Sequence, residues 1–165
     1  MVRQAPVEER VGWVLKRAQQ ALRAAMDEAL RRRGLTTAQY AALNALEEAS
    51  GLSGAELARR CFVTPQTMNE IVAHLEAGGL VKRRRGDDAR VLRADLTAAG
   101  LDLVSACHQT VAAIEERMVS RLSPRERQQL LDGLRRCVDA LEEAPAPTMQ
   151  PCRDVTECPN AVPYS

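Results

Sequence analysis

Aromatic residues are scarce in this 165-residue chain, which has one Trp, two Tyr and one Phe. A core with so few aromatic side chains must be built from Leu, Val, Ala and Met, a composition that suits packed helices better than sheets. The chain has no apolar run near the roughly 18 residues that cross a bilayer, and residues 1–10 lack the apolar core of a signal peptide. We therefore expect a mainly helical, cytoplasmic protein without a membrane partner.

Residues that usually mark catalytic or metal sites are also few. The chain has two His, His74 and His108, and we find no glycine-rich phosphate loop and no His-Glu zinc motif. Cys107 and His108 are adjacent, so a helix would turn their side chains about 100° apart and make shared metal ligation awkward. We expect no enzyme activity, no cofactor and no metal site.

The five Cys are irregularly spaced, and without a secretion signal this favours reduced thiols. Cys61 falls on the inward side of an expected helix, where a free Cys usually behaves as a small hydrophobe; the alternative is a redox role. Cys152 and Cys158 lie among five prolines in residues 145–165, which we expect to be disordered. They are either inert or redox-sensitive thiols that could form a loop-closing disulfide.

Residues 64–77 carry the pattern of a short helix. Thr64 can cap its N-terminus, and Pro65 stands at the first helical position, where its missing N–H costs nothing. An inward apolar stripe follows at helical spacing, formed by Met68, Ile71, Val72 and Leu75. The outward side chains suit base edges in a DNA major groove and include Gln66, Thr67, Asn69 and Glu70. The alternative is an ordinary solvated helix surface.

Another helix is expected just before it. Ser53 can cap this helix, and Glu56 completes a capping box. Only about three residues, 62–64, separate the two helices, and so short a connection forces the tight corner of a helix-turn-helix unit. Gly78 and Gly79 then end the second helix.

Two arginine-rich strands are predicted next, at residues 80–85 and 90–96, with a turn between them. This hairpin carries Lys82, Arg83, Arg84, Arg85, Arg90 and Arg93. A strand pair cannot bury so many cations without carboxylate partners, so we expect them to be exposed. Exposed cations can neutralise DNA phosphates, and Arg90, oriented by Asp88, can enter a narrow minor groove. The alternative is a soluble edge strand that its charges protect from aggregation.

Long amphipathic helices are expected on both flanks, at residues 7–33 and 97–142. Their apolar stripes exceed what a small core can cover, which favours a homodimer over a compact monomer. Two-fold symmetry would place two reading helices roughly 34 Å apart on a pseudo-palindromic site. Trp13 lies nearly opposite the apolar stripe of the first helix, where it would contact either the partner subunit or a ligand.

This order of parts resembles the MarR family of bacterial winged helix-turn-helix transcription regulators. The segments that match are LTTAQYAALNAL from residue 35, ELARRCFVTPQTMNEIVAHLEAGGLVKR from residue 56, the Asp88-x-Arg90 tip, and LTAAG from residue 96. Two residues depart from the pattern: Cys61 stands where an aliphatic residue is usual, and Phe62 where a small residue is common. Neither removes an expected contact residue.

The resemblance implies a mainly α fold with a small β-hairpin wing, in one domain over residues 1–144. The winged core would span about residues 35–96, and the flanking helices would form the dimer. We expect a sequence-specific repressor that binds double-stranded DNA and is released by a small phenolic or aromatic effector or by an oxidant. The alternative is a helical protein-interaction module that does not target DNA. The expected DNA contacts are Ser53, Thr64, Pro65, Gln66, Thr67, Asn69, Glu70, Arg83, Arg84, Arg85, Asp88 and Arg90.

Overall fold

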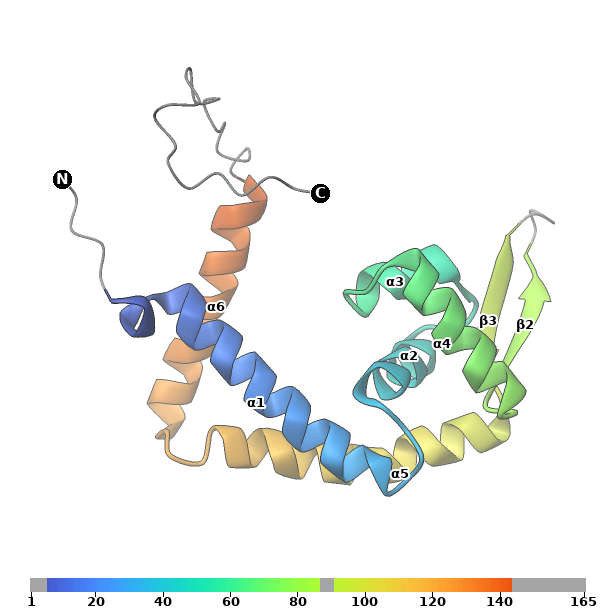
Figure 1. Cartoon of the computed structure of the whole chain (residues 1–165), viewed down its shortest axis with the longest axis horizontal. Helices are drawn as coiled ribbons and strands as arrows, with labels where there is room; N and C mark the ends of the chain where they lie inside the picture. Colours follow the sequence, from blue (N-terminus) through green and yellow to red (C-terminus); the bar gives the residue numbers. More distant parts are fainter. Residues whose placement is uncertain (1–5, 87–90, 144–165) are drawn as a thin grey trace, which may run out of the picture. The chain divides into compact units, whose positions relative to one another are not determined.

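The structure is a computed structural model that describes residues 6–86 and 91–143, and the chain divides into two compact units, residues 1–120 and 121–165. In chain order (Figure 1) the elements are η1 (Val7–Glu9), α1 (Val11–Arg31), α2 (Thr37–Glu48), β1 (Leu52–Ser53), α3 (Gly54–Arg60), α4 (Pro65–Ala77), β2 (Val81–Arg85), β3 (Leu92–Leu96), α5 (Ala98–Met118) and α6 (Pro124–Glu143). The predicted mainly helical fold with a small hairpin is confirmed. Within the described ranges, no helix has the length and apolar content to cross a bilayer.

The first helix begins later than its apolar spacing predicts. η1 is a separate 3-10 turn, and Arg10 after it has an extended backbone with φ −79° and ψ 129°. An extended residue interrupts the ladder of hydrogen bonds from residue i to residue i−4. The ladder therefore starts anew, and α1 begins at Val11 rather than at residue 7.

Side chains cap four helices of the first unit at their N-termini. The caps are Thr36 on α2, Ser53 on α3, Thr64 on α4 and Thr97 on α5. Each hydroxyl oxygen accepts a hydrogen bond from the backbone N–H three residues later, which satisfies a donor that the helix start leaves unpaired. The capping box predicted at Ser53 and the cap predicted at Thr64 are confirmed.

A third strand joins the predicted hairpin. β2 and β3 pair antiparallel, from Val81 opposite Leu96 to Arg85 opposite Leu92. β1 pairs with the other edge of β3, so the strand order is β1-β3-β2. A strand of two residues is too short to show the alternating pattern that reveals strands in a sequence, which is why β1 was not predicted. Because β1 leads directly into α3, it ties the start of that helix to the wing.

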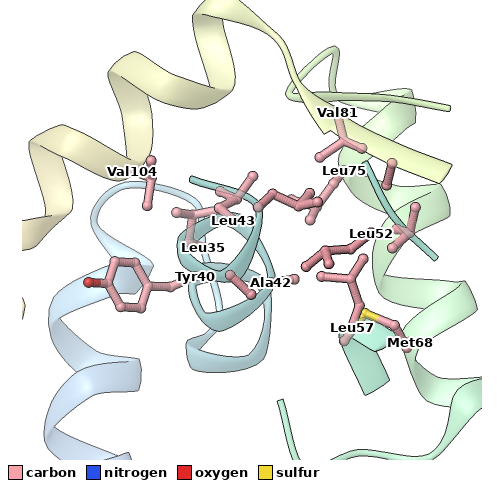
Figure 2. Close-up of a cluster of buried hydrophobic side chains, with 14 of the residues drawn as sticks. Leu35, Tyr40, Ala42, Leu43, Leu52, Leu57, Met68, Leu75, Val81 and Val104 are labelled. Carbon is pink, nitrogen blue, oxygen red and sulfur yellow. The ribbon is translucent and has the colours of Figure 1, made fainter. Parts of the chain in front are cut away.

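The core of the first unit is aliphatic, as the shortage of aromatic residues predicts. Figure 2 shows Leu43 of α2, Leu57 of α3 and Leu75 of α4 in one buried cluster. Tyr40 is the aromatic member of this cluster among the described residues. The predicted inward stripe of α4 is confirmed, since Met68, Val72 and Leu75 are buried and Ile71 packs against the core.

The second unit contains α6 (Pro124–Glu143), and Ser123 caps its start. The backbone N–H and the hydroxyl of Ser123 donate to Glu126 Oε2 at 2.8 and 2.7 Å, and Glu126 N–H donates to Ser123 Oγ at 3.4 Å. The hydrogen bond from the Ser123 side chain lowers the pKa of Glu126. Several large apolar residues of α6 are exposed: Leu130, Leu131, Val138 and Leu141.

Candidate nucleic-acid interface

The N-terminal turn of α4 presents polar groups to solvent. Thr64 Oγ1 accepts a hydrogen bond from Thr67 N–H at 3.1 Å, and the two hydroxyl oxygens lie 2.8 Å apart. Pro65 occupies the first helical position, as predicted. The positive end of the helix dipole lies at this turn, so it favours a negatively charged partner.

The outward side of α4 is polar and accessible. The side chains predicted to reach base edges are all exposed: Gln66, Thr67, Asn69 and Glu70. Met68 lies among them in sequence but is fully buried, and it anchors the opposite side of the helix. Asn69 also lies beside the start of α3, where its Oδ1 would be 3.2 Å from a Cβ on Gly54. A glycine at that position lets the two helices approach closely.

The turn between α3 and α4 holds an exposed aromatic residue in an unusual conformation. Phe62 has a φ of 54°, in the left-handed region that bulky residues seldom adopt. Val63 N–H donates to Ala58 O at 3.0 Å and closes the turn. The Phe62 side chain is 95% exposed. The left-handed backbone of Phe62 is part of the helix end that closes α3, and it leaves the aromatic ring in solvent.

Ser53 is held by the capping box of α3. Its Oγ accepts from Glu56 N–H at 3.3 Å, and its own N–H donates to Glu56 Oε2 at 2.7 Å. The hydrogen bond with the Ser53 side chain, followed by the one with its backbone, lowers the pKa of Glu56. The Ser53 hydroxyl is therefore part of the capping box that begins α3.

Arg83 is bound to α4. Its Nε donates to Glu76 Oε2 at 2.7 Å, its Nη2 lies 2.6 Å from the same oxygen, and its backbone N–H donates to Oε1 at 3.2 Å. The hydrogen bond from the Arg83 side chain lowers the pKa of the Glu76 carboxyl. This ion pair fastens β2 to the last turns of α4.

Arg84 and Arg93 also have carboxylate partners. Arg84 Nε donates to Asp95 Oδ2 at 2.7 Å across the hairpin. Arg93 Nη1 donates to the carbonyl oxygen of Gly51 at 2.7 Å and lies 3.6 Å from Glu56 Oε2. The hairpin is thereby connected to both α3 and the segment before it.

The expectation that all wing cations are simply exposed is therefore wrong. Arg83 and Arg93 are half-buried, because acids from α4 and α3 come within reach only when the chain folds. Arg85 is exposed and makes no ion pair with the residues of the described ranges. The predicted tip residues Asp88 and Arg90 lie outside the described residues, as do the tail thiols Cys152 and Cys158.

Comparison with known proteins identifies the group to which this interface belongs. Residues 33–90 match the model of the MarR family. The HTH-type transcriptional repressor Rv2887 of Mycobacterium tuberculosis is 38% identical over 120 residues, which span 72% of this chain and 86% of Rv2887. The chain belongs to the MarR family. It is therefore a DNA-binding transcription regulator, as its motifs predict.

Solved structures of other proteins share the winged fold of this MarR-family chain. A MarR family regulator from Silicibacter pomeroyi has a TM-score of 0.75 at 26% identity, over 86% of this chain and 99% of that one. Rv2887 of Mycobacterium tuberculosis in complex with DNA has a TM-score of 0.64 at 33% identity, over 81% and 98%. Its complex with salicylic acid has a TM-score of 0.66 at 34% identity, over 83% and 99%.

This MarR-family chain also has a pocket that the sequence did not indicate. A cavity of about 240 Å³ lies between α1, α2 and the α3–α4 turn. Its lining includes the apolar residues Leu22, Met26 and Phe62 and also Arg23, whose Nε lies 3.8 Å from Asp27 Oδ2. Trp13, predicted to contact a partner or a ligand, is 41% exposed and is not among the lining residues. Residues from three separate segments form the pocket, so no local pattern reveals it.

The internal cysteines and His108 take part in packing. His108 Nδ1 lies 3.1 Å from the Tyr40 hydroxyl, and its Nε2 lies 2.6 Å from Glu47 Oε2, which joins α5 to α2. Burial raises the pKa of the Cys61 and Cys107 thiols and favours their less reactive protonated form. This supports the interpretation of Cys61 as a small hydrophobe rather than a redox group.

Proposed function

We propose that the chain represses transcription by binding a pseudo-palindromic operator as a homodimer, and that a small aromatic acid releases it. The observation that carries the proposal is the exposed polar side of α4. The buried apolar side chains of the same helix anchor it to the core, beside the cationic hairpin. Rv2887 is named a transcriptional repressor, and one of its solved structures is a complex with DNA. This similarity supports repression, rather than activation, as the effect of this chain on transcription.

In this proposal α4 reads the major groove. Gln66 and Asn69 can each pair bidentately with adenine, and Thr67 can contact the methyl group of thymine. Glu70 can accept a hydrogen bond from the amino group of cytosine. Pro65 sets the first turn, and the hydroxyls of Ser53 and Thr64 bind backbone phosphates and fix the register.

The wing contacts the DNA beside the groove that α4 occupies. Arg85, exposed and without an ion pair among the described residues, neutralises a phosphate. Arg90, oriented by Asp88, enters the minor groove, as the sequence predicts. The sequence also predicts DNA contacts for Arg83 and Arg84. In this proposal the two arginines instead hold the wing in position, because each is paired with a carboxylate.

Exposed apolar side chains support the homodimer. Those on α1 are Val11, Trp13, Val14 and Leu15, and those on α6 are Leu130, Leu131, Val138 and Leu141. Single exposed apolar residues are common, but two helices that both present several of them favour burial against a second copy. In this arrangement Trp13 contacts the partner subunit, and the two copies of α4 lie about 34 Å apart along DNA.

The effector site is the cavity beside the α3–α4 turn. Arg23 can bind a carboxylate group, Leu22 and Met26 can cover an aromatic ring, and Phe62 can stack on it. The complex of Rv2887 with salicylic acid supports an aromatic acid as the ligand class. Because Phe62 lies on the turn, a bound ligand would change how α4 is held and weaken DNA binding.

Fluorescence anisotropy on DNA from upstream of the chain's own gene tests the proposal. We expect affinity that falls steeply with salt, and we expect Asn69→Ala to reduce the preference for the operator over altered operators by about tenfold. Lys16→Ala, an exposed change on α1, is the matched control. Binding that ignores both salt and sequence would favour a protein-interaction module instead.

A further inference from the structure

A second cavity, of about 410 Å³, lies between α1 and α5 of the first unit. It shares no lining residue with the pocket beside the α3–α4 turn. Three arginines line it: Arg32 and Arg33 directly follow α1, and Arg117 lies in the last turn of α5. The cavity volume is within the range of sites that bind small organic molecules.

The positive charge of these arginines is not neutralised by the side chains that the structure describes. Arg32, Arg33 and Arg117 make no ion pair within that part of the chain. The one carboxylate in the lining belongs to Glu28, whose Oε2 lies 2.7 Å from Nη1 of Arg31. The cavity wall therefore carries three cations and an acid that is already paired.

Stabilisation of helix ends does not explain this arrangement. A cation near a helix C-terminus is favourable, which accounts for each arginine taken singly. It does not account for three arginines at one concave surface. Their like charges repel one another there, and the concave shape strengthens the positive electrostatic potential inside the cavity. Planar guanidinium groups bind carboxylate and phosphate groups through paired hydrogen bonds.

The rest of the lining indicates the body of the ligand. Ala25, Ala29 and Ile114 provide an apolar floor, and Thr110 adds one hydroxyl. We propose that this cavity binds a small organic anion with two or more carboxylate or phosphate groups on an apolar framework. The anionic groups contact Arg32, Arg33 and Arg117, and the framework lies on the floor.

Isothermal titration calorimetry with trimesate, which carries three carboxylates on an aromatic ring, tests this inference. The titrations use the full chain without DNA, at constant ionic strength. We expect saturable binding with one site per chain, weakened about tenfold or more by Arg33→Gln and by Arg117→Gln. Arg17→Gln removes an exposed charge of α1 outside the lining, and we expect unchanged affinity.

Arg23→Gln separates this site from the aromatic-acid pocket. Loss of trimesate binding in Arg23→Gln, with no effect of Arg33→Gln and Arg117→Gln, would place the anion in the other pocket and overturn the inference. Absence of saturable binding to the unmodified chain would also overturn it. Melting temperatures of the variants establish that they are folded, so a lost binding signal reports on the site.

Discussion

At the scale of single residues, the arginines of the hairpin divide into two groups. Arg83, Arg84 and Arg93 reach carboxylates, whereas Arg85 makes no ion pair with any residue that the structure describes. The ion pairs are partly exposed, and exposed pairs contribute only about 0–1 kcal/mol each. Their main effect is to orient the wing relative to α3 and α4. In the proposed complex with DNA, the remaining wing arginines Arg85 and Arg90 then make the contacts.

Asp27 shows how one side chain connects two helices. Its Oδ1 accepts hydrogen bonds from the backbone N–H and the hydroxyl of Thr37, at 2.9 and 2.6 Å, and joins α1 to the start of α2. The bond from the Thr37 side chain, and then the backbone bond, lower the pKa of Asp27 from 3.8. A carboxyl with a lowered pKa stabilises the fold above pH 3.8, and it loses that contribution as the pH falls through its folded-state pKa.

We predict that Asp27→Asn lowers the free energy of unfolding at pH 7 by roughly 1 kcal/mol. We also predict a weaker pH dependence below about pH 4, because the variant no longer binds that proton. Urea titrations over a series of pH values measure both effects, with Asp102→Asn on α5 as the control. A pH profile identical to that of the unmodified chain would contradict the prediction.

At the scale of elements, the turn between α3 and α4 combines strain with exposure. Phe62 holds a φ of 54° while its side chain is 95% exposed, so glycine at this position would lose almost no buried area. Glycine adopts this conformation without steric cost but adds freedom to the unfolded chain, and the two effects oppose each other. In the proposed effector site, the Phe62 side chain acts through its position in the lining of the pocket.

We predict that Phe62→Gly changes the free energy of unfolding by less than about 1 kcal/mol and weakens salicylate binding about fivefold. The affinity falls because the aromatic surface that stacks on the ligand is removed. Phe62→Tyr keeps that surface and is the control. Calorimetric titration with salicylate measures the affinities, and equal values for Phe62→Gly and the unmodified chain would refute a role for the ring.

The start of α5 depends on a close backbone approach. A Cβ on Gly100 would clash with the carbonyl oxygen of Leu80, and that oxygen also accepts from Thr97 N–H at 3.0 Å. The clash involves backbone, which cannot move aside as a flexible side chain can. The end of α4, the hairpin and α5 are therefore joined at this contact.

We predict that Gly100→Ala destabilises the fold by about 2 kcal/mol or more, because the start of α5 must shift away from Leu80. Gly12→Ala is the matched control, since a Cβ at Gly12 would meet nothing within 4 Å. Thermal and urea unfolding measure both variants. If they unfold alike, the close approach does not constrain the fold.

The elements that the sequence predicted are those with local signals. Thr64 and Pro65 mark the start of α4 within one turn, and its buried stripe repeats at helical spacing. β1 escaped prediction because it has two residues and depends on Ala94 and Arg93 for its partners. The start of α1 was misplaced because apolar spacing runs through Arg10, whereas backbone hydrogen bonding does not.

At the scale of the whole molecule, the exposed apolar side chains of α6 favour burial against a second copy of the chain. Val138 on α6 is 52% exposed and Leu131 is 48% exposed, on a helix without a fully buried residue. Burial of such side chains against a second copy would supply the driving force for a homodimer. The proposed operator geometry rests on this assembly, because one α4 per chain can read only one half-site.

We predict that Val138→Asp raises the dissociation constant of the homodimer at least about a hundredfold, because a buried carboxylate would lack a partner. Leu92→Asp introduces the same charge at an exposed position of β3, outside the flanking helices, and is the control. Sedimentation velocity over a concentration series measures the dissociation constants. An unchanged assembly state of Val138→Asp would exclude this surface of α6 from the interface.

The sequence by itself determined the order of α3, α4, β2 and β3, the capped start of α4 and which of its residues face outward, because these depend on residues within one or two turns. The tertiary structure decided the partners of the wing arginines, the contact of Gly100 with Leu80, and both cavities. Arg93 and Gly51, for example, are 42 residues apart. Such groups meet only after folding, since burial of the core fixes the directions in which separate segments approach one another.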